Sequence, residues 1–263
     1  MPVNDELSTE QISVLYGALL GDGCLSVHKN GMNAVFCYLS HSYQHTQFIQ
    51  EYFKEYVSSE IYKYTFFDVR TNHEYTNYSF KTLSNSTFTE IYNCWYHNGI
   101  KKIPQNLKLN PLICLIWYIG DGSICNVNRT QYIKLSTHCF SKEDQENILL
   151  PQLSQFEAKL MKASLGKNGE QQYFIYIPRR KIKDFLNYIG DCPFDDYQYK
   201  WAYKEYKNAM PRNHTAHENE FCEMYKSGMT YYAIAKQFNI EPNAVKYYLK
   251  KNQLYRGTYN ENY

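Results

Sequence analysis

Two segments of the chain combine a helical hydrophobic period with an acid at their end. In residues 8–22, apolar side chains recur at i, i+3, i+4 and i+7 on two opposite faces, and Gly17 lies in a stripe of small residues on one of them. Residues 110–122 repeat this pattern and finish on the same Gly-Asp-Gly triplet. A helix that is apolar on two faces is typical of a protein interior, so both helices are expected to be buried.

Both helices also carry clear signals at their ends. Ser8 lies three residues before Gln11, as in a capping box, and Asn110 precedes Pro111, which suits the first helical position. A helix C-terminus carries partial negative charge, so an acid there has the unfavourable sign. Two ordinary core helices would explain the apolar stripes but not the two terminal acids, which favour a bound cation.

The segments that follow the two helices also correspond to each other, so the chain contains an internal repeat. Each helix is followed by two strands, a helix, two strands and a helix. The corresponding pairs are strands 35–41 and 132–138, helices 44–56 and 142–156, strands 77–83 and 172–178, and helices 86–97 and 180–190. Strand pairs between helices predict an α+β fold of two pseudo-symmetric αββαββα half-domains, each an antiparallel sheet with helices on one face. The other face of each sheet stays open for a large partner.

The C-terminal part of the chain has a different composition. The spacing of apolar residues in 229–251 predicts a helix-turn-helix, with Asn239 in the turn and Pro242 in the first turn of the second helix. A helical hairpin that only packs on the core is the alternative. The expected organisation is therefore a first half-domain 1–109, a second half-domain 110–208, a linker 209–220 and a small all-α helix-turn-helix tail 221–263.

Composition indicates the cellular environment of the protein but not its function. The formal net charge of +2 does not by itself argue for nucleic acid. The eight cysteines form no Cys-x-x-Cys pair and are interpreted as thiols in a reducing compartment. No apolar run approaches the roughly 20 residues of a membrane span, and the polar N-terminus is unlike a signal peptide. The protein is expected to be intracellular, in a compartment that composition does not specify.

The segments "LYGALLGDG" (15–23) and "CLIWYIGDG" (114–122) resemble the two motifs of single-chain LAGLIDADG homing endonucleases. The resemblance extends from residue 8 to about residue 208. It implies that the two motif helices pack at a pseudo-twofold axis and that two saddle-shaped sheets straddle double-stranded DNA. The implied function is a sequence-specific endonuclease, active as a monomer, that hydrolyses one phosphodiester in each strand of a long asymmetric site.

The resemblance also implies a catalytic centre. Asp22 and Asp121 are its expected acids and metal ligands, with the carbonyl groups of Gly21 and Gly120 as backbone ligands. The cofactor would be Mg²⁺ or Mn²⁺, because hard cations prefer oxygen ligands. One departure from the family pattern is Ile116, which stands where the first motif has a glycine and predicts a looser helix crossing on that side.

Members of the family also place a basic residue, usually lysine, in each half. The segment 98–107 carries Lys101, the preferred candidate, next to Lys102, and the segment 197–201 carries Lys200. An ordinary solvated lysine is the alternative in both halves.

Contacts to DNA are expected from outward strand residues, from the start of the last repeat helix and from the tail. The candidates are Ser26, His28, Arg70, Lys81, Asn126, Arg129, Lys134, Arg179, Arg180, Asn243, Lys246, Tyr247 and Lys250.

Two other functions remain open from the sequence. A DNA-binding transcription regulator can combine a LAGLIDADG-like domain with a helix-turn-helix, but such proteins have lost the acids, whereas this chain keeps both. An RNA maturase that assists its host intron is the other alternative and would make intron RNA a further partner. Target sequence, host element and organism are not determined by the sequence.

Overall fold

The computed structural model describes residues 6–27, 31–127, 130–203 and 214–255. The first repeat contains α1 (Thr9–Leu20), β1 (Cys24–Val27), β2 (Ala34–Ser40), α2 (Tyr43–Tyr52), the 3₁₀ turn η1 (Lys54–Tyr56), β3 (Tyr62–Asp68), β4 (His73–Lys81), α3 (Ser86–Trp95), β5 (Tyr96–His97) and β6 (Ile100–Lys101). The second repeat contains α4 (Pro111–Asp121), β7 (Gly122–Val127), β8 (Thr130–Ser136), α5 (Lys142–Asp144), the π turn η2 (Gln145–Leu149), α6 (Leu150–Gln152), the 3₁₀ turn η3 (Ser154–Phe156), β9 (Lys159–Leu165), β10 (Gln171–Pro178), the 3₁₀ turn η4 (Arg179–Lys181), α7 (Ile182–Ile189) and the 3₁₀ segment η5 (Asp195–Trp201). The predicted order of helices and strands is confirmed in both repeats.

The N-terminal signals of the two motif helices act as predicted. The Ser8 hydroxyl accepts a hydrogen bond from the Gln11 amide, and the Gln11 side chain accepts one from the Ser8 amide, which completes the capping box. Asn110 caps α4 through the Ile113 amide, with Pro111 at the first helical position. Both helix starts are therefore decided by residues close in sequence.

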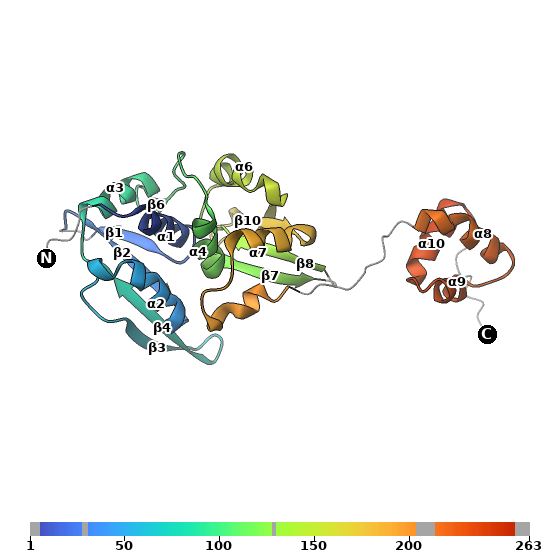
Figure 1. The fold of residues 1–263 in the computed structure, drawn as a ribbon, viewed down its shortest axis with the longest axis horizontal. Coiled ribbons are helices and arrows are strands. Elements are labelled where there is room, and N and C mark those ends of the chain that lie inside the picture. The colour runs from blue at the N-terminus through green and yellow to red at the C-terminus, as the bar shows by residue number, and fades with distance from the viewer. Residues whose placement is uncertain (1–5, 28–30, 128–129, 204–213, 256–263) are drawn as a thin grey trace. The chain divides into compact units, whose positions relative to one another are not determined.

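The two four-stranded sheets have the same antiparallel topology, with strand orders β1-β2-β4-β3 and β7-β8-β10-β9 (Figure 1). In β2, burial alternates, and Ala34, Phe36, Tyr38 and Ser40 are the buried positions. The corresponding helices pack on that side, because α2 and α3 both contact β2. One face of each sheet thus belongs to the core and the other stays open, as the α+β prediction requires.

A second compact unit follows the repeats. The chain divides into residues 1–204 and 205–263, and the second unit holds the 3₁₀ turn η6 (His214–His217), α8 (Glu218–Lys226), α9 (Tyr231–Gln237) and α10 (Pro242–Lys251). Its own core contains Phe221, Ile234, Val245 and Leu249. Residues 214–220 are helical, so the predicted linker 209–220 extends too far, because α8 needs its first turn to bring Phe221 into this core. Residues 209–213 of that linker lie outside the described part.

The turn between α9 and α10 agrees with its sequence signals. Asn239 has a φ of 52°, the left-handed conformation that Asn tolerates, and Pro242 opens α10. In the described part of the chain, no helix is long and apolar enough to cross a membrane.

Candidate metal centre

The two motif helices α1 and α4 pack directly against each other, and the contact centres on a glycine. A Cβ atom at Gly17 would lie 2.6 Å from Ile116 Cβ and 2.7 Å from the Ile113 carbonyl oxygen. Gly17 and Ile116 occupy corresponding positions of the two motifs, so the missing side chain of one makes room for the larger side chain of the other. The expectation of a looser crossing at Ile116 is therefore wrong, since one glycine of the pair is enough for close approach.

This crossing brings the ends of the two helices together. Asp22 follows Gly21, which caps α1, and Asp121 is the last residue of α4. A Cβ atom at Gly120 would lie 3.3 Å from Asp22 Oδ2, and one at Gly21 would lie 3.7 Å from the Asp121 amide nitrogen. Each acid therefore lies beside the last turn of the opposite helix, and two helix ends with partial negative charge meet at two carboxylates.

Both carboxyl groups resist ionisation in this position. Burial, followed by the charge of Asp22, raises the pKa of Asp121 to about 6. The pKa of Asp22 is also raised by burial among protein atoms, although its side chain reaches solvent, and Lys200, His41 and Lys101 oppose this rise. A pair of acids whose ionised forms are disfavoured would be stabilised by a cation.

The two predicted lysines also lie at this centre, one at the end of each motif helix. Lys101 Nζ donates hydrogen bonds to the carbonyl oxygens of Leu19 (2.9 Å) and Gly23 (2.8 Å) at the end of α1. Lys200 Nζ donates to the carbonyl oxygens of Ile119 and Gly120 at the end of α4. Each ammonium group thus satisfies carbonyl groups that a helix end leaves without partners.

Burial lowers the pKa of both lysines, that of Lys200 to about 8. The alternative of solvated surface lysines does not fit Lys200, which is buried, or Lys101, which is half-buried. Lys102, the other candidate in the first half, is exposed. The first-half lysine at the centre is therefore Lys101.

The groups at the centre match the oxygen ligands that hard divalent cations prefer. Two carboxylates and the carbonyl groups of Gly21 and Gly120 are the available oxygens, and the Gly120 carbonyl also accepts the Lys200 hydrogen bond. A carbonyl oxygen has two lone pairs, so this bond leaves one acceptor position. Among the described residues, no cluster of three or more His, Cys, Asp or Glu side chains could hold a metal. Other ligands would have to come from backbone, water or substrate.

Comparison with known proteins agrees with this geometry. A model of the LAGLIDADG DNA endonuclease family matches residues 12–185, more than half of the chain. The chain belongs to this LAGLIDADG family. Its fold resembles that of the homing endonuclease I-WcaI, solved bound to its DNA recognition sequence, with a TM-score of 0.64, 20% identity and coverage of 76% of this chain and 88% of that one.

Curated relatives of this LAGLIDADG protein include both characterised and uncharacterised proteins. DNA endonuclease I-ChuI of Chlamydomonas applanata is 27% identical over 210 residues, 74% of this chain and 95% of that protein. The uncharacterized protein MJ1098 of Methanocaldococcus jannaschii is 27% identical over 146 residues, 54% of this chain and 55% of its own. Cytochrome b mRNA maturase bI2 of Saccharomyces cerevisiae is 24% identical over 74% of this chain and 48% of its own length. The chain thus spans about half of the latter two proteins.

The strand candidates for DNA contact fall into three groups. Ser26, Lys81 and Lys134 lie on the open faces, since their neighbours Leu25, Phe80 and Leu135 are buried. Asn126 is exposed, but it pairs with buried Gln131 and so belongs to the helix-covered face of its sheet. The prediction that Asn126 points outward is therefore wrong. Successive side chains of a strand point to opposite faces of the sheet, and Asn126 falls on the covered one. His28 and Arg129 lie outside the described residues.

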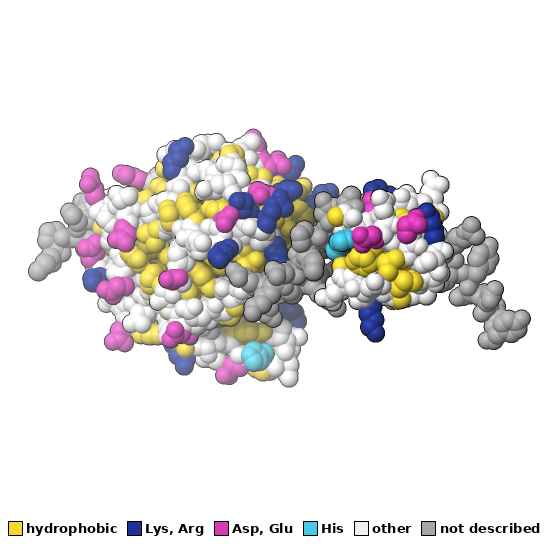
Figure 2. Space-filling model, turned by 45° about the vertical axis from the view of Figure 1, so that its right-hand side comes forward, with side chains coloured by type: hydrophobic (Ala, Val, Ile, Leu, Met, Phe, Trp, Pro, Cys, Tyr) yellow, Lys and Arg dark blue, Asp and Glu magenta, His cyan; other side chains and the backbone are white. Residues whose placement is uncertain are grey.

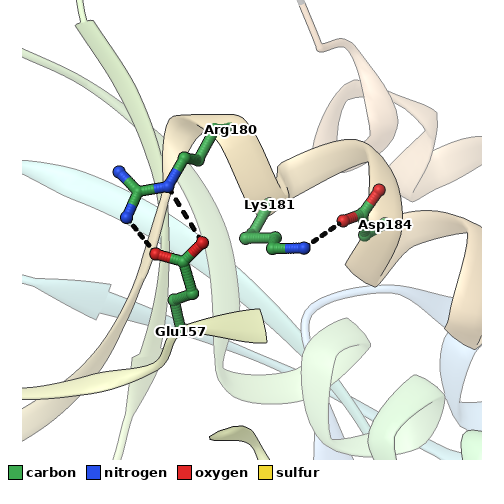
Figure 3. A network of polar contacts seen from close by, with 4 residues as sticks. All are labelled: Glu157, Arg180, Lys181 and Asp184. Atoms are coloured by element: carbon green, nitrogen blue, oxygen red, sulfur yellow. Dashed lines mark hydrogen bonds and ion pairs between the residues drawn. The ribbon is translucent and has the colours of Figure 1, made fainter. Parts of the chain in front are cut away.

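The charged candidates at the strand ends are partly engaged with acids. Arg70 lies in the turn after β3 and forms an ion pair with Asp68 at 3.3 Å. Arg180 forms a two-pronged ion pair with Glu157, beside the Lys181–Asp184 pair (Figure 3). Its guanidinium group is thus already matched to a carboxylate, which disfavours the predicted phosphate clamp at this residue. Arg179 is half-buried and engaged in a contact of its own.

The tail candidates lie together on α10. Asn243, Tyr247 and Lys250 are exposed, and Lys246 is half-buried with its ammonium group 4.8 Å from the ring centre of Tyr255. Acidic, basic and apolar side chains all appear on the face of the molecule in Figure 2, consistent with the small net charge. On the face shown there, charge alone therefore marks no DNA-binding surface.

Sequence reasoning missed a group of polar residues beside the centre. His41 contributes to the electrostatics of Asp22, and His45 is fully buried between Tyr38 and Ser40. His41 ends the segment "VFCYLSH" (35–41) and directly follows β2, and its nearness to Asp22 is a tertiary contact that the sequence does not record.

Proposed function

We propose that this protein is a sequence-specific DNA endonuclease that uses divalent metal to hydrolyse one phosphodiester bond in each strand of a long, asymmetric site. The observation that carries the proposal is the meeting of Asp22 and Asp121 at the ends of two helices, with a buried or half-buried lysine at each end. Four groups of this kind, two per half, suit a reaction that is performed twice.

Asp22 and Asp121 would hold the metal, with the carbonyl groups of Gly21 and Gly120 as further oxygen ligands. Mg²⁺ or Mn²⁺ bound there would supply an activated water and stabilise the leaving oxygen of an in-line displacement. Both pKa values are raised by burial, so a bound cation favours the ionised carboxylates and its binding should release protons near pH 6.

The lysines of the chain would act beside this metal. A Lys200 ammonium group with a pKa of about 8 can exchange a proton near neutral pH, and in its charged form it stabilises negative charge on a phosphate. Lys101 has the corresponding place at the end of α1. We assign each lysine to the reaction on one strand.

The open sheet faces would carry the DNA, with Ser26, Lys81 and Lys134 among their outward side chains. A single chain contains both acids, so a monomer suffices and its two unequal sheets would read an asymmetric site. The helix-turn-helix of the tail, through Asn243, Lys246, Tyr247 and Lys250, would add contacts beyond one end of that site. I-WcaI, with the same fold, was solved with its DNA recognition sequence bound.

Assistance in RNA splicing is a second candidate, because one curated relative is a cytochrome b mRNA maturase. Host intron RNA would then be an additional partner. A purely DNA-binding regulator is disfavoured because both acids and both lysines are present at the centre.

The decisive experiment incubates the full chain with a randomised double-stranded DNA library and Mg²⁺ and sequences the cut ends. A parallel reaction contains EDTA. Staggered ends that share one long sequence and disappear in EDTA are the expected result. Enrichment of bound sequences without cut ends would make the protein a DNA-binding regulator instead.

A further inference from the structure

The segment that carries Lys200 is held by the opposite half of the molecule. In η5, the Asp196 carboxylate accepts a 2.5 Å hydrogen bond from the Ser42 hydroxyl, and the Asp196 amide donates to Gln44 Oε1 at 3.2 Å. Ser42 and Gln44 belong to the start of α2 in the first half-domain. Lys200 is therefore placed by a segment docked across the half-domain boundary.

The lysine of the first half is held within its own half. Lys101 belongs to β6, where it pairs with Tyr96 of β5, and the Lys102 amide donates to the Trp95 carbonyl at 2.6 Å. The second half-domain contacts the chain only farther on, where the Leu109 amide donates to Gln152 Oε1 at 2.8 Å and Gln152 Nε2 donates to the Leu107 carbonyl at 3.0 Å. Gln152 is the last residue of α6, and this contact between the half-domains touches neither lysine.

The contact between the half-domains beside Lys200 contains a series of linked hydrogen bonds. His45 Nε2 lies 2.8 Å from the Tyr38 hydroxyl, His45 Nδ1 lies 3.2 Å from Ser40 Oγ, and Ser40 Oγ lies 3.1 Å from the Tyr197 hydroxyl. Burial lowers the pKa of His45 to about 3, so the imidazole is neutral and joins the chain as one donor and one acceptor. The Tyr197 ring also packs edge-on against His45.

Tyr197 in turn contacts Lys200. The Lys200 ammonium group lies 4.7 Å from the centre of the Tyr197 ring, within the range of a cation–π interaction. The same ammonium group donates hydrogen bonds to the two carbonyl oxygens at the end of α4. The ring thus bounds the ammonium group on one side, and the helix end bounds it on another.

We propose that the first half-domain positions Lys200 of the second half-domain: Ser40 and His45 hold Tyr197, and the Tyr197 ring holds the ammonium group. Tyr197 is a positioning residue, and the reaction on the strand assigned to Lys200 thereby depends on a contact between the half-domains. The inference rests on the proposed function, because it assigns one strand to each lysine. A displacement of about 1 Å can cost on the order of 100-fold in rate, so loosening this contact should slow one strand.

The test compares Tyr197→Leu with Gln152→Ala on a cleavable site labelled on both strands. Under single-turnover conditions, Tyr197→Leu should slow one strand by about tenfold to 100-fold, so that a nick accumulates in the other strand. Gln152→Ala, which removes a contact between the half-domains that touches neither lysine, is the matched control and should favour neither strand. Site affinity without divalent metal should be unchanged in both variants. Tyr197→Phe, which keeps the ring over Lys200, should lose far less than Tyr197→Leu. Equal slowing of both strands by Tyr197→Leu would overturn the proposal.

A second readout needs neither metal nor DNA. The side-chain methylene protons of Lys200 next to the Tyr197 ring should give an upfield-shifted NMR signal, assigned by its loss in Lys200→Met. Tyr197→Leu should abolish the shift, whereas Tyr197→Phe, which keeps the ring but loses the hydroxyl bonded to Ser40, should only reduce it. A signal that stays in place in Tyr197→Leu would overturn the positioning role even if cleavage slows.

Two controls separate the possible failures. If Tyr197→Leu does not fold, Ser40→Ala removes the link between His45 and Tyr197, together with the hydrogen bond that Ser40 Oγ accepts from the Ser42 amide at 3.2 Å. This variant should reduce the NMR shift and slow the same strand. If Lys200→Met cleaves both strands normally, the proposed role of Lys200 fails while the NMR result still stands. If Lys200→Met is slow but Tyr197→Leu is normal, only the positioning inference fails.

Discussion

Gly17 of α1 lies directly beneath Ile116 of α4, so closely that a methyl group on Gly17 would fall 2.7 Å from the Ile113 carbonyl oxygen. That oxygen is backbone and cannot rotate away, so α4 would have to move. The contact joins the two halves at the point from which both acids project. The spacing of the acids therefore depends on a position that carries no chemistry.

We expect Gly17→Ala to destabilise the protein by about 1 to 3 kcal/mol, the usual cost of overpacking, and to reduce cleavage. Urea unfolding measures the first effect and plasmid linearisation the second. Adding Ile116→Ala should not recover the loss, because the Ile116 Cβ atom at 2.6 Å and the Ile113 carbonyl oxygen at 2.7 Å both remain. An unchanged unfolding midpoint would mean that the helices separate without cost.

We expect Asp22→Asn and Asp121→Asn each to abolish double-strand cleavage while raising the stability of the metal-free protein at pH 7. When the pKa of a carboxyl group is higher in the folded state than in the unfolded state, the protein loses stability as the pH rises from the unfolded value to the folded one. For Asp121 the folded value is about 6. Above that pH the ionised pair is fully unfavourable, and an amide removes this cost. Thermal unfolding in EDTA and plasmid linearisation with Mg²⁺ test the two effects, and normal cleavage by either variant would sink its assignment.

Lys200→Met should slow cleavage by roughly 100-fold or more, the scale of a positioned proton-transfer or charge-stabilising group, with little change in site affinity. The measurement is a single-turnover rate beside a gel-shift titration. Lys102→Met is the matched control, because Lys102 is exposed beside Lys101 and should cleave like the unmodified chain. Weaker binding with an unchanged rate would make Lys200 a phosphate contact.

The neutral, buried His45 predicts sensitivity to acid. Its folded pKa is about 3 against about 6.5 when unfolded, so the stability it contributes is present above pH 6.5 and is lost as pH falls towards 3. The full loss is on the order of 5 kcal/mol from the ~1.4 kcal/mol per pKa unit. Urea unfolding at pH 7 and pH 5 should show a smaller pH effect for His45→Gln. If the free energy of unfolding changes equally with pH in the two proteins, His45 is protonated in the folded state without cost.

A chain ending at residue 213 should remain folded and able to cleave, because both acids and both lysines belong to the unit 1–204. If the tail docks on DNA, this variant should bind its site more weakly, with the salt slope of log K reduced by roughly 0.9 per lost phosphate contact. The footprint should shorten at one end only. Identical footprints and slopes would assign the tail to another partner.

Much of the secondary structure follows from neighbouring residues alone. Ser8 with Gln11, Asn110 with Pro111, and Asn239 before Pro242 start or end helices through contacts within a few positions, and the alternation along β2 shows which face is buried. The repeated Gly-Asp-Gly triplets identify the acids for the same reason, because each acid directly follows or ends the helix that the sequence pattern predicts.

The arrangement at the centre was decided by tertiary packing. Lys200 reaches carbonyl groups of α4, and Tyr197 reaches Ser40, across long stretches of chain. From the sequence, Ile116 predicts a looser helix crossing, but Gly17 lies opposite it in the fold. Arg180 is a predicted DNA contact, but its guanidinium group is bonded to Glu157. Local pattern determines where elements begin and which side is apolar, but a side chain's partner is whatever the folded chain brings within a few ångströms, and no sequence spacing records that.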